Sequence, residues 1–251
     1  MSGPASNLNP RVRFSFTDPR FIILLLGFFV LLALPFVAFW VNDTFLISFV
    51  SKVMIFAIAA ATLDLILGYG GMVSFGHAAY LGLGAYAVAV WSKYAYDYDI
   101  EWMRNGYLHF ATAIVGSAIV ALFIGAMSLR TSGLYFIMIT LAFTQMLYYL
   151  GISLEPFGGD DGMNTDRSDF LLFKLNENIL AEKGALPDGT TIYFFTLAML
   201  IAVLFILRRI VNSRFGMVIR GAQSNPVRMQ AIGFPTYRYR LTAFVIAGAL
   251  A

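Results

Sequence analysis

The sequence contains no cysteine, and charged residues occupy only 12% of its 251 positions. The absence of cysteine excludes disulfides and thiolate-bound metals. Soluble domains carry about 25% charged residues, because polar groups must cover the surface around a core of limited size. The composition therefore excludes an ordinary soluble enzyme, a disordered regulator and a disulfide-stapled secreted domain.

Catalytic and nucleotide-binding motifs are also scarce. The chain has two histidines, no H-E-x-x-H zinc motif and no P-loop, so we expect it to bind no metal, no ATP and no other cofactor. Residues 82–87 match a relaxed dinucleotide-binding pattern, but that motif needs a strand–turn–helix context and here it lies inside an apolar run. An intramembrane enzyme would need several ionisable groups at membrane depth, and Asp64 is the only acidic residue well inside an apolar run.

What the sequence does contain is apolar residues in long runs. Hydrophobic residues make up 59% of the chain, and its mean hydropathy is +0.76. A helix of about 20 apolar residues crosses a hydrocarbon layer of ~30 Å. The runs predict an all-α polytopic membrane protein with six complete spans, at residues 21–41, 45–67, 72–91, 107–127, 134–154 and 190–207. A seventh run begins at Leu241 and reaches only about half a bilayer by Ala251, so we expect the natural protein to continue.

The distribution of basic residues predicts the orientation in the membrane. With the N-terminal segment 1–20 in the cytoplasm, eleven basic residues fall on the inner side and five in the outer loops. The positive-inside rule requires such an excess, so the net charge of +3 reports topology and not nucleic-acid binding. Two loops are longer than connectors. Residues 155–189 lie outside with eight acidic and three basic side chains, and residues 208–240 lie inside with seven arginines and no acid.

Six glycines gather between residues 68 and 84, together with a serine and a histidine. In a membrane, such glycines either let helices approach closely or allow a broken helix whose backbone lines a polar cavity. The sequence leaves both interpretations open. The candidates for a substrate pathway in this stretch are Gly68, Gly70, Gly71, Ser74, Gly76 and His77.

Three polar residues in other apolar runs are further pathway candidates. Asp64 either takes part in transport or lies near the inner interface, where its carboxylate reaches water. Thr140 and Thr144 share one helix face, which either lines a passage or supplies structural hydrogen bonds, between helices or back to its own helix. For these two threonines we favour the structural hydrogen bonds.

The inner loop carries the signature of a short helix. A capping residue and a proline suited to the first helical position precede the helical run, and a glycine ends it. A helix of about two turns is too short to be stable alone, so either a partner protein or the membrane surface should hold it. We favour a partner protein, because anionic lipid would explain the arginines but not a capped helix that ends at a glycine. The candidate docking residues are Ser224, Asn225, Pro226, Val227, Arg228, Met229, Gln230, Ala231, Ile232 and Gly233.

Three motifs in this order resemble the LivM-type permeases, which are one of two membrane subunits in ABC importers for branched-chain amino acids. Residues 65–80, continuing to residue 86, resemble the family signature; GGDDG at residues 158–162 resembles a second motif; and SRFG at residues 213–216 begins a third. The resemblance covers roughly residues 45–251. The family commonly has asparagine at the position of Asp64, and this chain departs from it again at Pro226, Arg228 and Met229, where glutamate and alanine are usual.

The resemblance implies a permease subunit in the bacterial inner membrane and adds Tyr80 to the pathway candidates. The implied partners are a second homologous permease, a periplasmic substrate-binding protein, the lipid bilayer and two cytoplasmic ABC ATPase subunits, on which ATP hydrolysis would take place. Residues 21–251 would then form one transmembrane permease domain. Two alternatives remain: a urea or short-amide ABC permease, which shares much of the glycine signature, and an ion-coupled secondary transporter working without ATPases.

Overall fold

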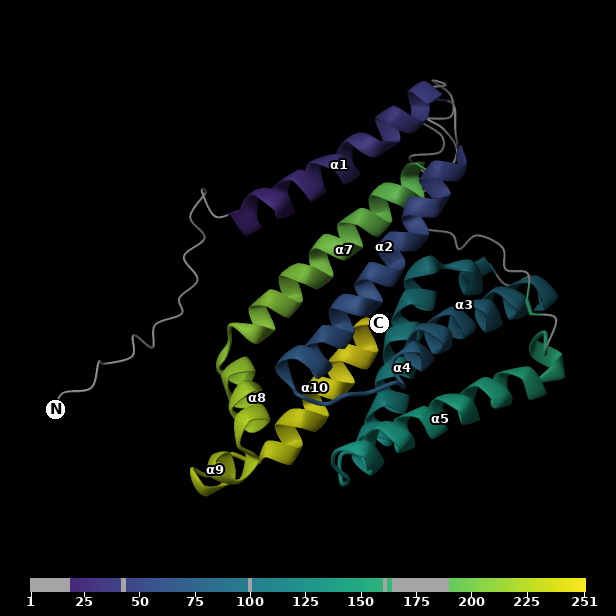
Figure 1. Cartoon of the computed structure of the whole chain (residues 1–251). Helices are drawn as coiled ribbons and strands as arrows, with labels where there is room; N and C mark the ends of the chain where they lie inside the picture. Colours follow the sequence, from purple (N-terminus) through teal and green to yellow (C-terminus); the bar gives the residue numbers. More distant parts are fainter. Residues whose placement is uncertain (1–18, 42–43, 99–100, 160–161, 164–189) are drawn as a thin grey trace.

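The computed structural model describes residues 19–41, 44–98, 101–159, 162–163 and 190–251, and these ranges hold helices and their connections but no strand. Long helices run beside one another, with two short ones at one end of the molecule (Figure 1). The elements are α1 (Pro19–Val41), α2 (Thr44–Asp64), η1 (Leu65–Tyr69), α3 (Ala78–Tyr98), η2 (Glu101–Arg104), α4 (Gly106–Ser128), α5 (Leu134–Ser153), η3 (Glu155–Phe157), α7 (Thr190–Val211), α8 (Arg214–Ser224), α9 (Pro226–Ala231) and α10 (Thr236–Leu250).

Four helical stretches in the described ranges are long and apolar enough to cross a membrane. They are Phe45–Tyr69, which joins α2 to the π turn η1, together with α4, α5 and α7. α1 contributes a shorter apolar stretch, Gly27–Ala38. The chain is therefore an all-α polytopic membrane protein, which confirms the fold class predicted from its composition.

Small residues bring α10 directly against α4. A Cβ atom placed on Gly248 would lie 2.7 Å from Ala121 Cβ, and one placed on Gly125 would lie 2.8 Å from the Phe244 ring. The buried Tyr80 ring of α3 meets Phe244 edge-on, with the ring centroids 5.9 Å apart. Because small residues let helix backbones approach closely in a membrane, these contacts join α3, α4 and α10 into one core.

A second core joins α2 to α7, with Ile47, Met54 and Tyr193 almost fully buried. The Tyr193 hydroxyl donates to the Leu31 carbonyl of α1 at 2.5 Å. Pro35 lies four residues after Leu31 and has no N–H to give to that carbonyl. The tyrosine therefore occupies a hydrogen-bonding position that proline leaves open, and it ties α1 to the rest of the fold.

The boundaries of the third predicted span were wrong. Residues 72–77 are not helical, and α3 begins at Ala78 and continues to Tyr98. This stretch has the composition of a span because it contains the apolar residues Met72, Val73 and Phe75. Its backbone is nevertheless not helical, and Gly71 before it has a positive φ.

The inner loop predicted at residues 208–240 contains more helix than one short element. α7 continues to Val211, α8 follows, and α10 begins at Thr236 and not at Leu241. α8 buries Val218 and Ile219 on one face. Its arginines lower the mean hydropathy of the stretch, so that the hydropathy pattern did not indicate a helix.

Candidate functional site

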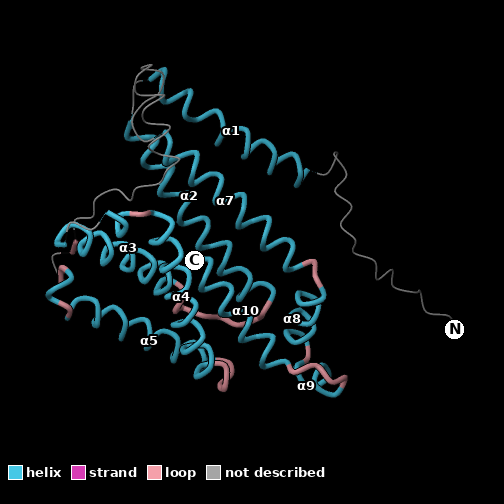
Figure 2. The backbone as a smooth tube through the Cα atoms, turned by 180° about the vertical axis from the view of Figure 1, so that it is seen from behind, coloured by secondary structure: helices cyan, strands magenta, loops and turns pink. Residues whose placement is uncertain are grey.

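The glycine segment, residues 68–77, joins α2 to α3 through a break in the helix (Figure 2). The Met72 N–H donates back to the Ile66 carbonyl at 3.0 Å, and Gly71 has a φ of +64°. Glycine adopts positive φ without the steric cost of a Cβ atom. The helix therefore ends at this glycine, and the chain runs without regular structure to Ala78.

Gly76 lies directly against α5. A Cβ atom on Gly76 would lie 2.9 Å from the Thr140 carbonyl oxygen and 3.1 Å from Thr144 Oγ1. The two threonine hydroxyls donate within their own helix, to Ile137 O at 3.0 Å and to Thr140 O at 2.9 Å. The glycine thus packs directly on the two threonines, whose hydroxyl hydrogens are already bonded to carbonyls of α5. The segment therefore breaks the helix and also packs closely on α5, while a polar cavity lined by its backbone stays a prediction.

His77 is only 5% exposed, and its Nε2 lies 2.9 Å from Thr62 Oγ1 of α2. That hydroxyl donates its hydrogen to the Ala59 carbonyl at 2.8 Å, so it accepts from His77 and the imidazole proton is on Nε2. Nδ1 is then an acceptor, buried and without a hydrogen-bond partner among the described residues. The His77 ring also meets Tyr80 edge-on at 5.7 Å, which fixes its plane.

The other end of the glycine segment faces α8. Asp64 is exposed at the end of α2, and a Cβ atom on Gly68 would collide with its carboxylate. The position favours the interpretation of Asp64 as a residue near the inner interface. Gln223 of α8 donates through Nε2 to the Gly68 carbonyl at 3.2 Å. Ser74 stays within the segment, where its hydroxyl accepts from the Gly76 N–H at 3.3 Å.

The pathway candidates therefore divide into two groups. The first group lies around the start of α3, where the segment contacts Thr62 of α2 and the threonines of α5; it comprises Ser74, Gly76, His77, Tyr80, Thr140 and Thr144. The second group lies at the α8 end and comprises Asp64, Gly68, Gly70 and Gly71. Sequence reasoning missed one partner in each group, Thr62 in the first and Gln223 in the second. Neither has a sequence signal, because Thr62 is an ordinary residue of an apolar run and Gln223 stands 155 positions from its partner.

The predicted short helix is present as α9. The Asn225 side chain accepts from the Arg228 N–H at 2.9 Å, Pro226 is the first helical residue, and Gly233 has a φ of +97°. Val227 and Ile232 are 72% and 65% exposed. The helix is thus capped at both ends and presents two aliphatic side chains outward.

Contacts with α8 and α10 hold α9 in place. Met229 packs on Gly221 of α8, where a Cβ atom would lie 2.7 Å from its sulfur. Gln230 donates to the Thr236 hydroxyl of α10 at 2.9 Å. Ser224 is the last residue of α8, and its hydroxyl donates to the Gly221 carbonyl at 3.0 Å. The N-cap of α9 is therefore Asn225 alone.

At the opposite end, the turn after α5 rests on α3. Tyr86 donates to the Phe157 carbonyl at 3.2 Å, Tyr94 meets the Phe157 ring at 6.0 Å, and Lys93 donates to the Pro156 carbonyl. Gly158, Gly159 and Gly162 all have positive φ, which is typical of a turn. Asp160, Asp161 and residues 164–189 of the predicted outer loop lie outside the described residues.

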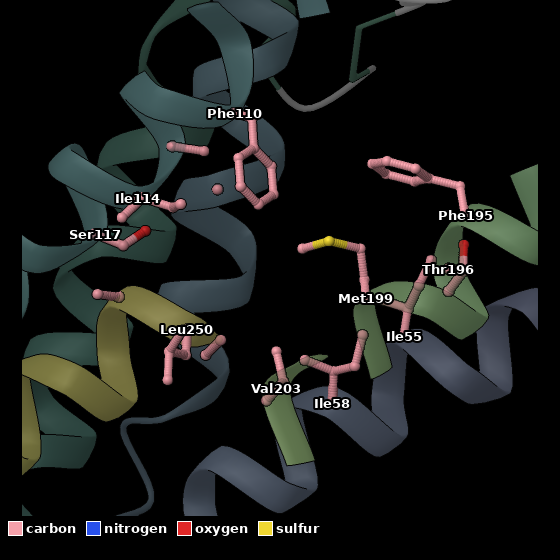
Figure 3. Close-up of a pocket in the computed structure, with 14 residues that line it drawn as sticks. Ile55, Ile58, Phe110, Ile114, Ser117, Phe195, Thr196, Met199, Val203 and Leu250 are labelled. Atoms are coloured by element: carbon pink, nitrogen blue, oxygen red, sulfur yellow. The ribbon is translucent and has the colours of Figure 1, made fainter. Parts of the chain in front are cut away.

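A cavity of about 300 Å³ lies between α2, α4, α7 and α10 (Figure 3). Its two hydroxyls already donate to backbone, Ser117 to Tyr80 O at 3.5 Å and Thr196 to Ile192 O at 2.8 Å. The remaining lining is apolar, and none of the predicted pathway residues contributes to it. The cavity suits hydrocarbon and offers no free donor to a charged solute.

Comparison with known proteins places this arrangement in a family. Residues 45–251 match the family described as the permease component of branched-chain amino acid transport systems. The chain belongs to this family of permeases. The match includes the glycine segment, α5, and the α8–α9 pair, so the whole candidate site lies within the shared part.

Two permease proteins of branched-chain amino acid transport are similar to the chain at low identity. The high-affinity branched-chain amino acid transport system permease protein LivM of Escherichia coli K12 is 24% identical over 215 residues, which cover 79% of this chain and 48% of that protein. LivM of Salmonella typhimurium is 23% identical over 220 residues, covering 82% and 50%. The chain thus spans about half the length of these relatives. No solved structure matches the chain.

Proposed function

We propose that this chain is a membrane subunit of an ATP-driven, binding-protein-dependent importer for branched-chain, hydrophobic amino acids in the bacterial inner membrane. The observation that carries the proposal is the family match over residues 45–251. A second, homologous permease completes the passage, and a periplasmic binding protein delivers the amino acid. The N-terminus and the α8–α9 pair face the cytoplasm in this proposal, because residues 208–240 carry seven arginines and no acidic residue, and the positive-inside rule assigns such a loop to the inner side.

α9 supplies the docking surface for the ATPase subunits in this proposal. A helix of six residues is not stable alone, yet α9 is capped and held against α8 and α10. Its exposed Val227 and Ile232 offer apolar anchors of the kind that fill a groove on a protein partner. Hydrolysis of ATP belongs to those partners, and α9 receives the resulting movement.

The start of α3, where His77 lies against Thr62 of α2 and Gly76 lies against α5, is the proposed contact for the transported amino acid. The unpartnered His77 Nδ1 can accept from an ammonium group. The helix break adds a second favourable term, since α3 begins at Ala78, next to His77, and its N-terminal end carries partial positive charge that can face a carboxylate. Both charges of a zwitterion can therefore be compensated without a charged side chain in the hydrocarbon layer.

The test is uptake of labelled leucine and urea by proteoliposomes that contain the second permease and the ATPases, with and without this chain. We expect leucine uptake that requires ATP, binding protein and this chain together. Uptake of urea alone would assign the chain to the amide permeases. Leucine uptake that continues without ATPase subunits would instead indicate an ion-coupled transporter.

A further inference from the structure

The side chain of Gln223 touches the glycine segment at two points. Its Nε2 donates to the Gly68 carbonyl at 3.2 Å. Its Cγ lies so near Gly71 that a Cβ atom placed there would be 2.7 Å away. Gln223 thus both bonds to and packs against the place where η1 ends.

The bond forms because the helix end leaves the Gly68 carbonyl available. In a continuing α-helix, the Met72 N–H would donate to this carbonyl, which lies four residues earlier. Here Met72 donates to Ile66 O instead. The amide of Gln223 replaces the missing backbone donor.

Two neighbours of Gln223 contact the other helices at this end. Gly221 packs under Met229 of α9, and the Ala222 carbonyl accepts from Arg240 of α10 at 2.7 Å. Three consecutive residues of α8 therefore touch α9, α10 and the glycine segment in turn. Figure 1 shows α8 beside α9 and the start of α10, and α8 also contacts η1.

We propose that Gln223 is a positioning residue that passes movement of α9 to the glycine segment. This inference rests on the proposed function, because it assigns a route by which movement at the ATPase-docking helix reaches the substrate contact. α8 turns with α9 through the Met229–Gly221 contact, and the Gln223 amide then draws the Gly68 carbonyl and η1 with it.

The first experiment varies the group at residue 223 while its length stays similar. Gln223→Lys keeps a donor for the helix-end carbonyl, Gln223→Met removes the donor, and Gln223→Glu places an acceptor against it. The readout is leucine molecules imported per ATP hydrolysed by the assembled transporter in proteoliposomes. We expect the lysine variant to keep this ratio, the methionine variant to lower it about three- to ten-fold, and the glutamate variant to lower it further.

Gln145→Met is the matched control, because Gln145 is exposed on α5. It should leave the ratio unchanged. If Gln223→Met and Gln223→Glu import as much leucine per ATP as the unchanged protein, the inference is overturned. It is also overturned if Gln223→Lys loses as much of this ratio as Gln223→Met, since packing alone would then explain the effect. If the unchanged protein shows no ATP-dependent leucine uptake, the proposed function fails first, and the two failures are thereby distinguished.

A second experiment measures movement in the segment itself. The chain has no cysteine, so Phe75→Cys places a single thiol on a side chain that is 61% exposed. We expect the rate of maleimide labelling in the assembled transporter to change when ATP and vanadate are added, and this change to vanish in Phe75→Cys/Gln223→Met. An ATP-dependent change that persists without Gln223, or no change in either protein, would overturn the inference.

Discussion

Gly76 lacks a side chain at the point where the glycine segment comes nearest to α5. A methyl group there would lie 2.9 Å from the Thr140 carbonyl oxygen, and a backbone oxygen cannot rotate away as a side chain can. We expect Gly76→Ala to lower the free energy of unfolding in detergent by about 1–3 kcal/mol, as over-packed cores do, and to reduce leucine uptake. Thermal unfolding of the purified protein measures the first effect, and proteoliposome transport the second.

Gly82→Ala is the control for this prediction. Gly82 lies six residues after Gly76, within α3, and a Cβ atom on Gly82 would meet nothing within 4 Å. Alanine in a helix interior is more stable than glycine by up to about 1 kcal/mol, so this variant should be unchanged or more stable. If both variants unfold at the same temperature as the unchanged protein, Gly76 is not in close contact with α5.

At the scale of elements, α9 depends on its N-cap. Asn225→Ala removes the acceptor of the Arg228 N–H and should cost about 0.5–2 kcal/mol of helix stability. Because α9 has too few residues to re-form by itself, we expect weaker binding to the ATPase subunits, by roughly five-fold for a loss of 1 kcal/mol. Titration of the ATPase onto the detergent-solubilised permease measures this affinity.

Asn225→Ser keeps an acceptor and the same charge, and serine ranks with asparagine as a cap. It should bind the ATPase as the unchanged protein does. Equal affinity for the alanine and serine variants would mean that α9 does not dock the ATPase in its capped form.

The sequence predicted those elements whose signals are local. Apolar runs located α2, α4, α5 and α7, and the cap, proline and glycine around α9 located that helix almost to the residue. The start of α3 was missed because tertiary contacts, such as Gly76 on Thr140, hold apolar residues in a non-helical segment. α8 was missed because its arginines lower the mean hydropathy of the stretch, although one face of the helix is apolar and buried. Mean hydropathy over a window of sequence does not show which side of a helix is buried.

The candidate site divides in the same way. The sequence pointed to His77 and the glycines, since these residue types are unusual in an apolar run. It could not point to Thr62 or Gln223, whose roles come only from the partners that folding brings to them. Contacts between distant positions depend on how helices pack, and no single stretch of sequence carries that information.

At the scale of the whole molecule, helix ends that are far apart in sequence lie together at one end of the structure. The Tyr237 hydroxyl donates to Ala126 O at 2.9 Å, and Gln223 bonds to Gly68, so the starts or ends of α2, α4, α8 and α10 meet. The connection after α4 carries Arg130, and the arginines between residues 208 and 240 lie at the same end. The opposite end holds the turn around Phe157, docked on α3. This separation matches the orientation predicted from the basic residues.

The orientation can be tested across a single helix. α5 has 20 residues, which is about 30 Å and enough to cross the hydrocarbon layer. Ser132 and Ser153 are exposed at its two ends, and in a chain without cysteine each can be changed to the only thiol. We expect a membrane-impermeant maleimide added to intact spheroplasts to label Ser153→Cys at once, and Ser132→Cys only after lysis. The reverse pattern would place α9 outside, away from any cytoplasmic ATPase, and labelling of both before lysis would mean that α5 does not span the membrane.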